Sequence, residues 1–149
     1  MNGSVQMIYK RKVFYYETDK MAIVHHSNYI RWMEEARVEY LDKVGTPFDK
    51  MEELGLVCPV LGVNAEYVGM VRFGDTVTID VRLTEFKGVK MIVRYTMYKE
   101  DGSVCFRGES RHCFMKDGKI VNVRKKFPEI YEKMISELDT SENREVKTK

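Results

Sequence analysis

The polar side chains that could carry out chemistry gather in one stretch of the chain, between residues 15 and 29. In chain order they are Tyr15, Tyr16, Glu17, Thr18, Asp19, His25, His26, Ser27, Asn28 and Tyr29. The stretch leads into a pattern typical of an amphipathic helix. Backbone N–H groups in the first turn of a helix lack intrahelical partners and carry partial positive charge. Beside a carboxylate, such groups could polarise a carbonyl oxygen, which is chemistry suited to acyl transfer.

Asp19 and the start of the helix near His26 form the candidate catalytic pair. In this interpretation Asp19 acts as nucleophile or general base, and the helix start holds the carbonyl oxygen. An alternative stays open from residue chemistry alone. An aspartate in a loop before a helix is commonly a turn or cap residue, and two neighbouring histidines can simply be solvated.

Other kinds of site lack their sequence signatures. The segment from Gly108 to His112 misses the second glycine of a GxSxG nucleophile elbow, and neither a phosphate loop nor a GxGxxG dinucleotide pattern occurs. No HExxH occurs, and the adjacent His25 and His26 do not face each other on a helix. The sequence therefore predicts neither a metal site nor a bound cofactor.

Length and composition limit the remaining possibilities. The chain has 149 residues, 44% hydrophobic and 32% charged, which is ordinary for one globular domain. We expect a single domain over residues 1–138 and a flexible tail over residues 139–149, which hold one apolar side chain. The net charge of +2 gives no bulk electrostatic reason to expect nucleic-acid binding.

The cysteines and the apolar runs indicate the compartment. Cys58, Cys105 and Cys113 are odd in number and form no CxxC pair, so we expect buried, inert thiols. No apolar run follows a basic start at the N-terminus, and no stretch approaches the ~18 apolar residues of a membrane span. The sequence therefore predicts a cytoplasmic protein without a membrane span.

The hydrophobic pattern places the polar stretch between a strand and a long helix. Residues 7–16 are rich in Tyr, Val and Phe, which is typical of a strand. Apolar side chains then recur at helical spacing over residues 29–44, and Ser27 or Asn28 is the expected N-cap. The large apolar groups of this helix predict that it packs deep in the core, with its charged residues Glu34, Glu35, Arg37 and Glu39 on a solvated face or at subunit contacts.

The rest of the chain predicts antiparallel strands. Apolar and polar residues alternate over residues 61–67, 77–83 and 89–97, and a fourth strand-like run covers residues 104–115. Strict alternation predicts one buried face for each strand. A short helix is expected over residues 128–138. The sequence therefore predicts an α+β fold in which a curved antiparallel sheet wraps one long central helix.

Residues 15–41, YYETDKMAIVHHSNYIRWMEEARVEYL, closely resemble the active-site segment of the 4-hydroxybenzoyl-CoA thioesterase family of hot-dog proteins. That pattern runs roughly Y-x-x-x-D-x-x-G-I/V-V-x-H/Y-x-N-Y, followed by a helix with E-x-A-R. Here it is filled by Tyr15, Asp19, Ile23, Val24, His26, Asn28, Tyr29, Glu34 or Glu35, Ala36 and Arg37. Residues 65–75 look like the next strand and turn of the family. The resemblance extends from about residue 7 to residue 138.

The resemblance implies a hot-dog fold and hydrolysis of an acyl-CoA thioester to a free acid and CoA. It implies that Asp19 is the essential carboxylate, attacking the carbonyl directly or activating water. It further implies that the backbone N–H of His26 holds the carbonyl oxygen, while the His26 side chain and Tyr15 assist. Members of the family assemble as dimers, often paired into tetramers, so a homodimer or homotetramer with active sites between subunits is expected.

One departure from the family pattern concerns the loop beside Asp19. The family usually has glycine three residues after the aspartate, where this chain has Ala22. If that position needs a positive φ, alanine costs about 1 kcal/mol or more there. The departure concerns the geometry of the oxyanion hole and leaves the fold expectation intact.

The CoA phosphates require basic side chains near the mouth of a pocket. We assign Asn28, Lys87 and Lys90 to substrate or CoA binding, the lysines by charge alone. The basic run over residues 124–126 is a further candidate by charge, although a solvated cluster before a helix is the favoured interpretation of it. Two alternative functions stay open: hydrolysis of an acyl-carrier-protein thioester, for which residues 121–126 could supply a basic face, and a non-catalytic acyl-CoA-binding module.

Overall fold

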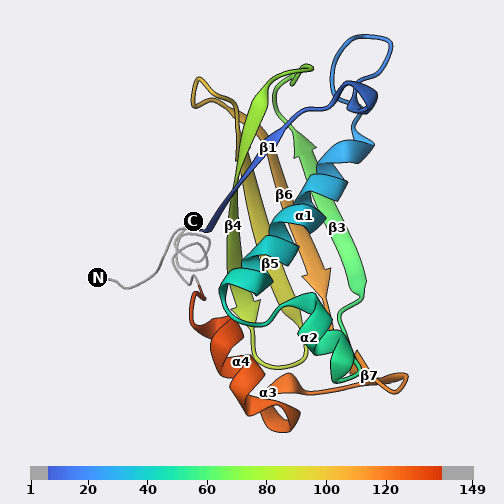
Figure 1. The fold of residues 1–149 in the computed structure, drawn as a ribbon, viewed down its shortest axis with the longest axis vertical. Helices are drawn as coiled ribbons and strands as arrows, with labels where there is room; N and C mark the ends of the chain where they lie inside the picture. Colours follow the sequence, from blue (N-terminus) through green and yellow to red (C-terminus); the bar gives the residue numbers. More distant parts are fainter. Residues whose placement is uncertain (1–6, 139–149) are drawn as a thin grey trace.

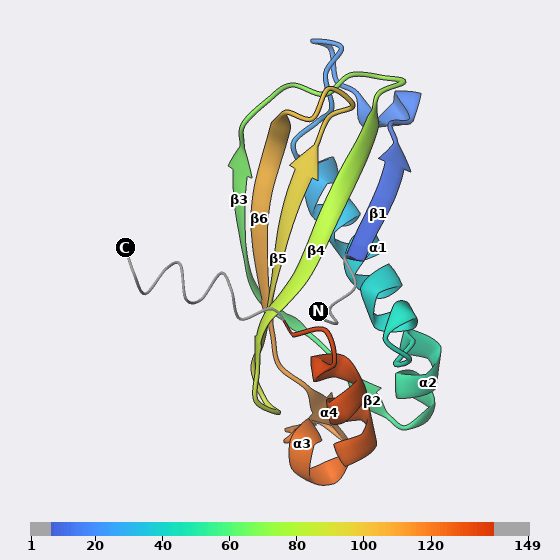
Figure 2. The same cartoon turned by 90° about the vertical axis from the view of Figure 1, so that its left-hand side faces the viewer.

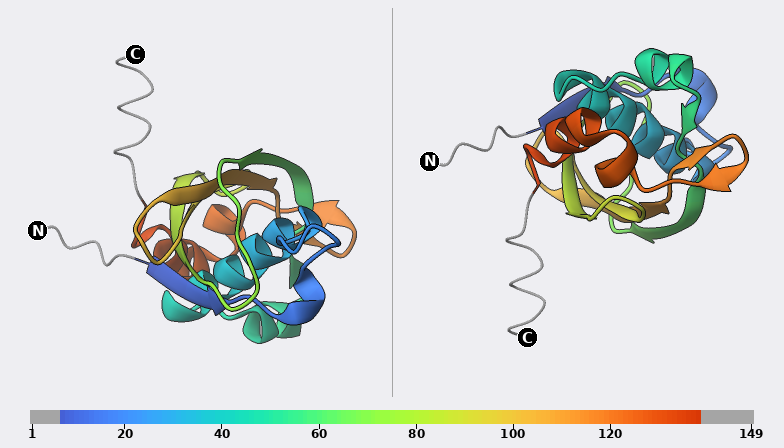
Figure 3. Two further views of the ribbon diagram at one scale, coloured as in Figure 1. Left: turned by 90° about the horizontal axis from the view of Figure 1, so that it is seen from above. Right: turned by 90° about the horizontal axis from the view of Figure 1, so that it is seen from below.

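A curved antiparallel sheet wraps one long helix in the computed structural model, which describes residues 7–138. The strands run in the order β1-β4-β5-β6-β3 (Figure 1). Their bounds are β1 (Met7–Lys12), β3 (Val60–Tyr67), β4 (Thr76–Phe86), β5 (Met91–Tyr98) and β6 (Val104–His112). Helix α1 (Ser27–Lys43) lies along the concave side of the sheet, as the views from both ends show (Figure 3). The predicted α+β arrangement is confirmed.

Helix α1 is central because its inward face is made of large apolar side chains. Trp32, Met33, Ala36, Tyr40 and Leu41 are all buried at helical spacing, as predicted. They meet the alternating side chains of β4 and β5, and together they form one hydrophobic core. Seen from the side, the sheet and α1 form two layers that enclose this core (Figure 2).

The central strands follow the predicted alternation, but β3 does not. Val77, Ile79 and Val81 on β4 are buried. On β3, however, Leu61 is 56% exposed and Tyr67 is 47% exposed, so the expectation of a buried face there is wrong for one chain. The reason is position: β3 is an edge strand that pairs only with β6, and its other edge has no partner among the described residues.

The first predicted strand is shorter than expected. Strand β1 ends at Lys12, and residues Tyr15–Glu17 form a 3-10 turn, η1, instead of continuing the strand. A short helix, α2 (Phe48–Glu53), follows α1 and was not predicted. The turn η1 lies at the end of the sheet that carries the polar stretch, whereas α2 lies at the opposite end (Figure 1).

The opposite end of the sheet carries the small elements. The fourth predicted strand, residues 104–115, ends at His112; residues beyond it contribute to a small second sheet of β2 (Leu56–Val57), β7 (Met115–Lys116) and β8 (Lys119–Ile120). Helices α3 (Val123–Lys126) and α4 (Pro128–Ile135) close this end, and the N–H of Val123 donates to the Gly88 carbonyl at 2.8 Å.

Two further expectations concerned a flexible tail and membrane-spanning segments. The expected tail over residues 139–149 lies outside the described residues. Among residues 7–138, no helix combines the length and apolar character needed to cross a membrane.

Candidate active site

Asp19 lies on a small hairpin that leads from η1 to α1. Thr18 and Val24 form an antiparallel bridge at its base, and the N–H of Asp19 donates to the Ile23 carbonyl at 2.9 Å. The N–H of Ala22 donates back to the Asp19 carbonyl at 2.9 Å, which closes a tight turn. This pattern is a three-residue hairpin loop, whose last residue adopts the left-handed conformation.

Ala22 occupies that left-handed position with a φ of 64°. The position where the family usually has glycine therefore has a positive φ in this chain, and alanine places a side chain there. An L-residue in this region costs about 1–2 kcal/mol. The surrounding hydrogen bonds hold the hairpin in place despite this cost.

The carboxylate of Asp19 is half-buried and only partly engaged. Its Oδ1 accepts from the N–H of Met21 at 2.8 Å, which fixes the orientation of the side chain. No described side chain donates to its other oxygen. Asp19 therefore presents a carboxylate oxygen that could meet a substrate or a water molecule.

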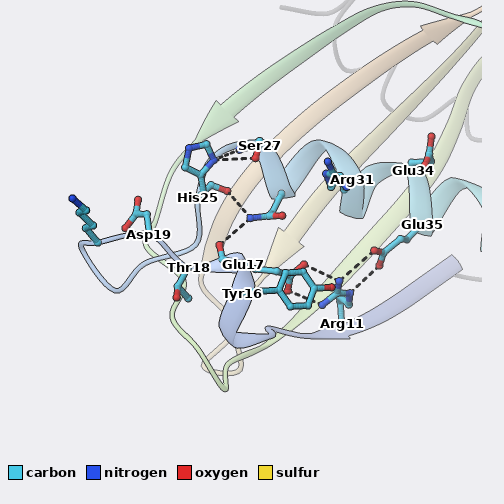
Figure 4. A pocket seen from close by; sticks show the side chains of 12 residues that line it. Arg11, Tyr16, Glu17, Thr18, Asp19, His25, Ser27, Arg31, Glu34 and Glu35 are labelled. Carbon is cyan, nitrogen blue, oxygen red and sulfur yellow. Dashed lines mark hydrogen bonds and ion pairs between the residues drawn. The ribbon is translucent and has the colours of Figure 1, made fainter.

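Two cavities meet at Asp19. One, of about 320 Å³, has largely apolar walls that include Ile23, Tyr29, Val68 and Met70. The other, of about 710 Å³, has polar and charged walls drawn from η1, the hairpin and the first turns of α1 (Figure 4). Because Asp19 lines both, a molecule with an apolar end and a polar end could occupy both cavities, with its middle part next to the Asp19 carboxylate.

His26 lies at the start of α1 and also lines the apolar cavity. No described group accepts from its backbone N–H, whereas its carbonyl accepts from the Tyr67 hydroxyl at 3.1 Å. Its ring stacks on that of His25, with centroids 4.2 Å apart. Asp19 and His26 thus line the same cavity, and the N–H of His26 is unused among the described residues.

The expected N-cap is different. His26, not Ser27 or Asn28, precedes the helix, and its side chain does not cap the first turn; Nδ1 of His25 instead accepts from the N–H of Ser27 at 3.2 Å. Ser27 lies 2.9 Å from Nδ1 of His25, and Asn28 Nδ2 donates to the Glu17 carbonyl at 2.9 Å. Asn28 lines the polar cavity, as expected for a binding residue, but its amide also supports the loop.

Tyr15 and the two lysines lie elsewhere. Tyr15 is 76% exposed and packs edge-on against Phe73, and it lines neither of the two cavities. Lys87 and Lys90 flank the turn between β4 and β5, at the end of the sheet opposite the Asp19 hairpin (Figure 1). Within one chain, the structure therefore groups Asp19, His26 and Asn28 but not the other three predicted residues.

A buried carboxylate beside the hairpin was not predicted from the sequence. Glu17 is 2% exposed and is held by Arg11, which also binds Glu35 at 2.9 Å (Figure 4). Burial alone would raise the pKa of Glu17, but hydrogen bonds from Phe14, Trp32 and Arg11 outweigh it and lower that pKa. The sequence shows no local signal for this site, because Trp32 is fifteen residues away.

A second buried polar cluster lies farther along α1. Arg37, expected on a solvated face or at a subunit contact, is 5% exposed, and its Nε has no hydrogen-bond partner among the described residues. Nearby, Ser110 bridges the Tyr95 hydroxyl and Nε2 of His112 at 2.7 Å each. Burial, together with Arg37, lowers the pKa of His112 to about 4, and the carbonyl of Pro59 offsets this only in part.

The thiols do not add a nucleophile to the site. Cys58, Cys105 and Cys113 are free, and burial raises the pKa of Cys58 to about 12 and that of Cys105 to about 11. Such thiols are protonated near neutral pH. Among residues 7–138, no three His, Cys, Asp or Glu side chains group as metal ligands.

Comparison with known proteins relates this architecture to one family. Residues 13–137 match the family described as the thioesterase-like superfamily. A relative from Aquifex aeolicus (strain VF5), provisionally named an esterase, is 39% identical over 123 residues, which cover 83% of this chain and 95% of the relative. A relative from Bacillus subtilis (strain 168), provisionally named an acyl-CoA thioesterase, is 33% identical over 120 residues, covering 79% of this chain and 87% of the relative.

A solved structure relates the fold of this chain to the same family. A solved DHNA-CoA thioesterase from Staphylococcus aureus matches with a TM-score of 0.82 at 24% identity, covering 96% of this chain and 93% of that chain. The predicted hot-dog fold is therefore confirmed. The match confirms the expected family at the level of the superfamily, which is broader than the 4-hydroxybenzoyl-CoA branch. This chain belongs to the thioesterase-like superfamily.

Proposed function

We propose that the protein hydrolyses an acyl-CoA thioester to a free acid and CoA. Membership of the superfamily makes the chain a thioester hydrolase. One observation carries the assignment of the site: Asp19 lines both an apolar and a polar cavity, next to an unused N–H at the start of α1. The narrower resemblance of residues 15–41 to the 4-hydroxybenzoyl-CoA family supports the same assignment.

In the proposed reaction, the thioester carbonyl oxygen accepts from the His26 N–H, which stabilises the negative charge that develops there. The Asp19 carboxylate attacks the carbonyl carbon or removes a proton from the water that attacks it. Direct attack forms an anhydride between Asp19 and the acyl group as the C–S bond breaks, and water then hydrolyses that anhydride and frees Asp19. In the other route water adds to the carbonyl carbon and the C–S bond then breaks. In both routes CoA leaves as a thiolate and is protonated. The His26 side chain and Tyr15 are proposed to assist.

The two cavities suggest where each part of the substrate binds. The apolar cavity suits the acyl group, and the polar cleft suits the amide-rich arm of CoA. Lys20 and Arg31 line that cleft and could meet CoA phosphates. Asn28 is proposed to bind there as well. Lys87 and Lys90 could contribute only from another subunit, because they lie at the far end of their own sheet.

We also propose that the chain assembles as a homodimer or homotetramer. The exposed apolar side chains of β3 and its unpaired edge support this assembly, since a second copy could cover both. The two alternative functions, an acyl-carrier-protein thioesterase and a non-catalytic binding module, make different predictions for turnover of free acyl-CoA.

Thiol release from short, long and aromatic acyl-CoAs tests the proposal. Asp19→Asn should lower kcat at least 100-fold while the far-UV circular dichroism spectrum stays unchanged. Asp101→Asn is the matched control, because Asp101 Oδ1 accepts from the N–H two residues ahead at 2.9 Å, as Asp19 Oδ1 does. Asp101 lines neither cavity, and its variant should turn over at the wild-type rate.

Three other outcomes would redirect the assignment. Equal turnover by Asp19→Asn and wild type would overturn the role of Asp19. Turnover of acyl-carrier-protein thioesters alone would favour the first alternative. Saturable acyl-CoA binding without turnover of either carrier would favour the binding module.

A further inference from the structure

We propose that Glu17 is a positioning residue for the reaction: through its carboxylate and its own carbonyl, it fixes the Asp19 hairpin against the start of α1. The inference rests on the proposed function, because it assumes that Asp19 and the His26 N–H act on one substrate. Glu17 borders the polar cavity but not the apolar one, and at 2% exposure its carboxylate is taken up by donors of the protein itself. Its effect on the reaction would pass through the placement of those two groups.

The carboxylate of Glu17 is saturated with donors from three elements. Oε1 accepts from Nη1 of Arg11 and from the N–H of Phe14, each at 2.8 Å. Oε2 accepts from Nη2 of Arg11 at 2.8 Å and from Nε1 of Trp32 at 2.9 Å. A bidentate arginine pair of this kind combines strength with fixed geometry. The carboxylate therefore joins the end of β1, the turn η1 and the buried face of α1.

The backbone carbonyl of Glu17 holds the other side of the hairpin. It accepts from the N–H of His25 at 2.8 Å and from Nδ2 of Asn28 at 2.9 Å. The segment between Glu17 and His25 is thereby closed at its base, with Asp19 inside it and His26 immediately after it. One residue thus anchors both ends of the loop that carries the proposed catalytic groups.

The four donors explain why a glutamine should not replace Glu17. An amide offers one acceptor oxygen and one NH₂ group, so the NH₂ would face donors from Arg11, Trp32 or Phe14. At least two of the four hydrogen bonds would be lost, and η1 would shift to relieve the contact between donors. A misplacement of about 1 Å can lower a rate about 100-fold.

The first test compares Glu17→Gln with Asp80→Asn. Glu17→Gln should lower kcat 10- to 100-fold and change KM less than 3-fold, because the Glu17 carboxylate is occupied by protein donors and is not free to bind the substrate. Asp80 is the control, since it is also a buried carboxylate paired with an arginine, Arg82, at 3.1 Å, but it lies on β4 away from both cavities. Asp80→Asn should leave kcat within 2-fold of wild type even if its Tm falls.

Trp32 supplies a readout that a general loss of stability would not move. It is the only tryptophan in the chain, and its Nε1 donates to Glu17. The emission spectrum of the folded Glu17→Gln variant should therefore differ from wild type, and that of Asp80→Asn should not. If Glu17→Gln does not fold, Trp32→Phe removes a single donor to the same carboxylate and should lower kcat 2- to 5-fold.

A double variant separates this inference from the proposed function. If Glu17 acts through Asp19, adding Glu17→Gln to Asp19→Asn should lower the residual rate less than 2-fold. A wild-type rate in Asp19→Asn would overturn the proposed role of Asp19, on which this inference rests. A normal kcat in folded Glu17→Gln, or in Trp32→Phe where Glu17→Gln does not fold, would overturn only the positioning role, as would a full 10-fold loss on the Asp19→Asn background.

Discussion

Two buried polar clusters lie along α1, and they differ in how completely they are paired. Near the N-terminal end, the Glu17 cluster joins a carboxylate to Arg11 and Trp32, and each carboxylate oxygen accepts two hydrogen bonds. Farther along the helix, the Arg37 cluster contains Tyr95, Ser110 and His112 but no carboxylate, and Nε of Arg37 has no hydrogen-bond partner among the described residues.

Because they are paired to different extents, the two clusters of buried polar groups have different physical roles. A fully paired network in a low-dielectric interior is rigid, because every change of geometry breaks a strong hydrogen bond. The Glu17 cluster therefore suits the support of a loop that must hold Asp19 in place. The Arg37 cluster instead keeps a cation next to a neutral histidine, so its contribution to stability depends on pH.

The largest expected effect comes from breaking the paired cluster. Arg11→Met would leave the Glu17 carboxylate buried without its cation, and truncating one partner of such a pair costs about 3–5 kcal/mol. Urea unfolding followed by circular dichroism measures the loss. A free energy of unfolding within 1 kcal/mol of wild type would remove the contrast between the clusters.

The Arg37 cluster should produce a loss of stability in mild acid. The pKa of His112 is about 4 in the folded chain and near 6.5 when unfolded. Its contribution is therefore fully present above pH 6.5 and is lost as pH falls to about 4, a change on the order of 3 kcal/mol. Urea unfolding at several pH values measures this slope.

Glu17 acts in a different pH range, which makes the two clusters separable. Its lowered pKa gives stability that is present above its unfolded value and disappears only at lower pH, as the folded group is protonated. His112→Gln should therefore flatten the slope between pH 6.5 and 4 and leave the more acidic limb in place. An unchanged slope in His112→Gln would assign the mild-acid loss to other groups.

The hairpin held by the Glu17 cluster contains a backbone conformation that costs less free energy than the loss of the Arg11 pair. Ala22→Gly should raise the free energy of unfolding by about 1 kcal/mol, because glycine adopts a φ of 64° without a steric penalty. Asp117→Gly is the control at the other non-glycine residue with positive φ, 54°. Its gain should be smaller, since aspartate tolerates this region better than alanine does. Equal gains would mean that the hairpin carries no special strain.

The smallest effect is expected at Arg37. A buried pair is costly to break mainly because one charge is left without its partner, and no ion pair is recorded for Arg37 among the described residues. Arg37→Met should therefore change the free energy of unfolding by less than about 1 kcal/mol, in contrast to Arg11→Met. A loss as large as that of Arg11→Met would show that Arg37 is stabilised as strongly as its paired counterpart.

Local pattern was enough to predict most of the fold. The helical spacing over residues 29–44 and the alternation in β4 and β5 follow directly from which side chains are apolar, and both are confirmed. The same alternation misled on β3, because burial of an edge strand depends on what covers it. The strand expected over residues 7–16 stopped early because Glu17 binds the N–H of Phe14 and holds a 3-10 turn there.

The candidate site was predictable only in part. Asp19, His26 and Asn28 lie close in sequence, so local reasoning placed them together. Glu17 and Arg37 were missed because important partners lie apart from them in the sequence: Trp32 is fifteen residues after Glu17, and His112 is at the end of β6, far along the chain from Arg37. Composition and spacing carry no sign of such long-range pairing.

The free edge of β3 has a consequence for how this protein behaves on dilution. Among residues 7–138, one side of this eight-residue strand pairs with no other strand, and it carries exposed Val60, Leu61 and Tyr67, so it forms a template for another strand. If a second copy covers that edge, the free energy of unfolding becomes a function of protein concentration. The midpoint of thermal unfolding would then fall as the protein is diluted, and dilute samples would be the first to lose chains to adsorption and to proteolysis.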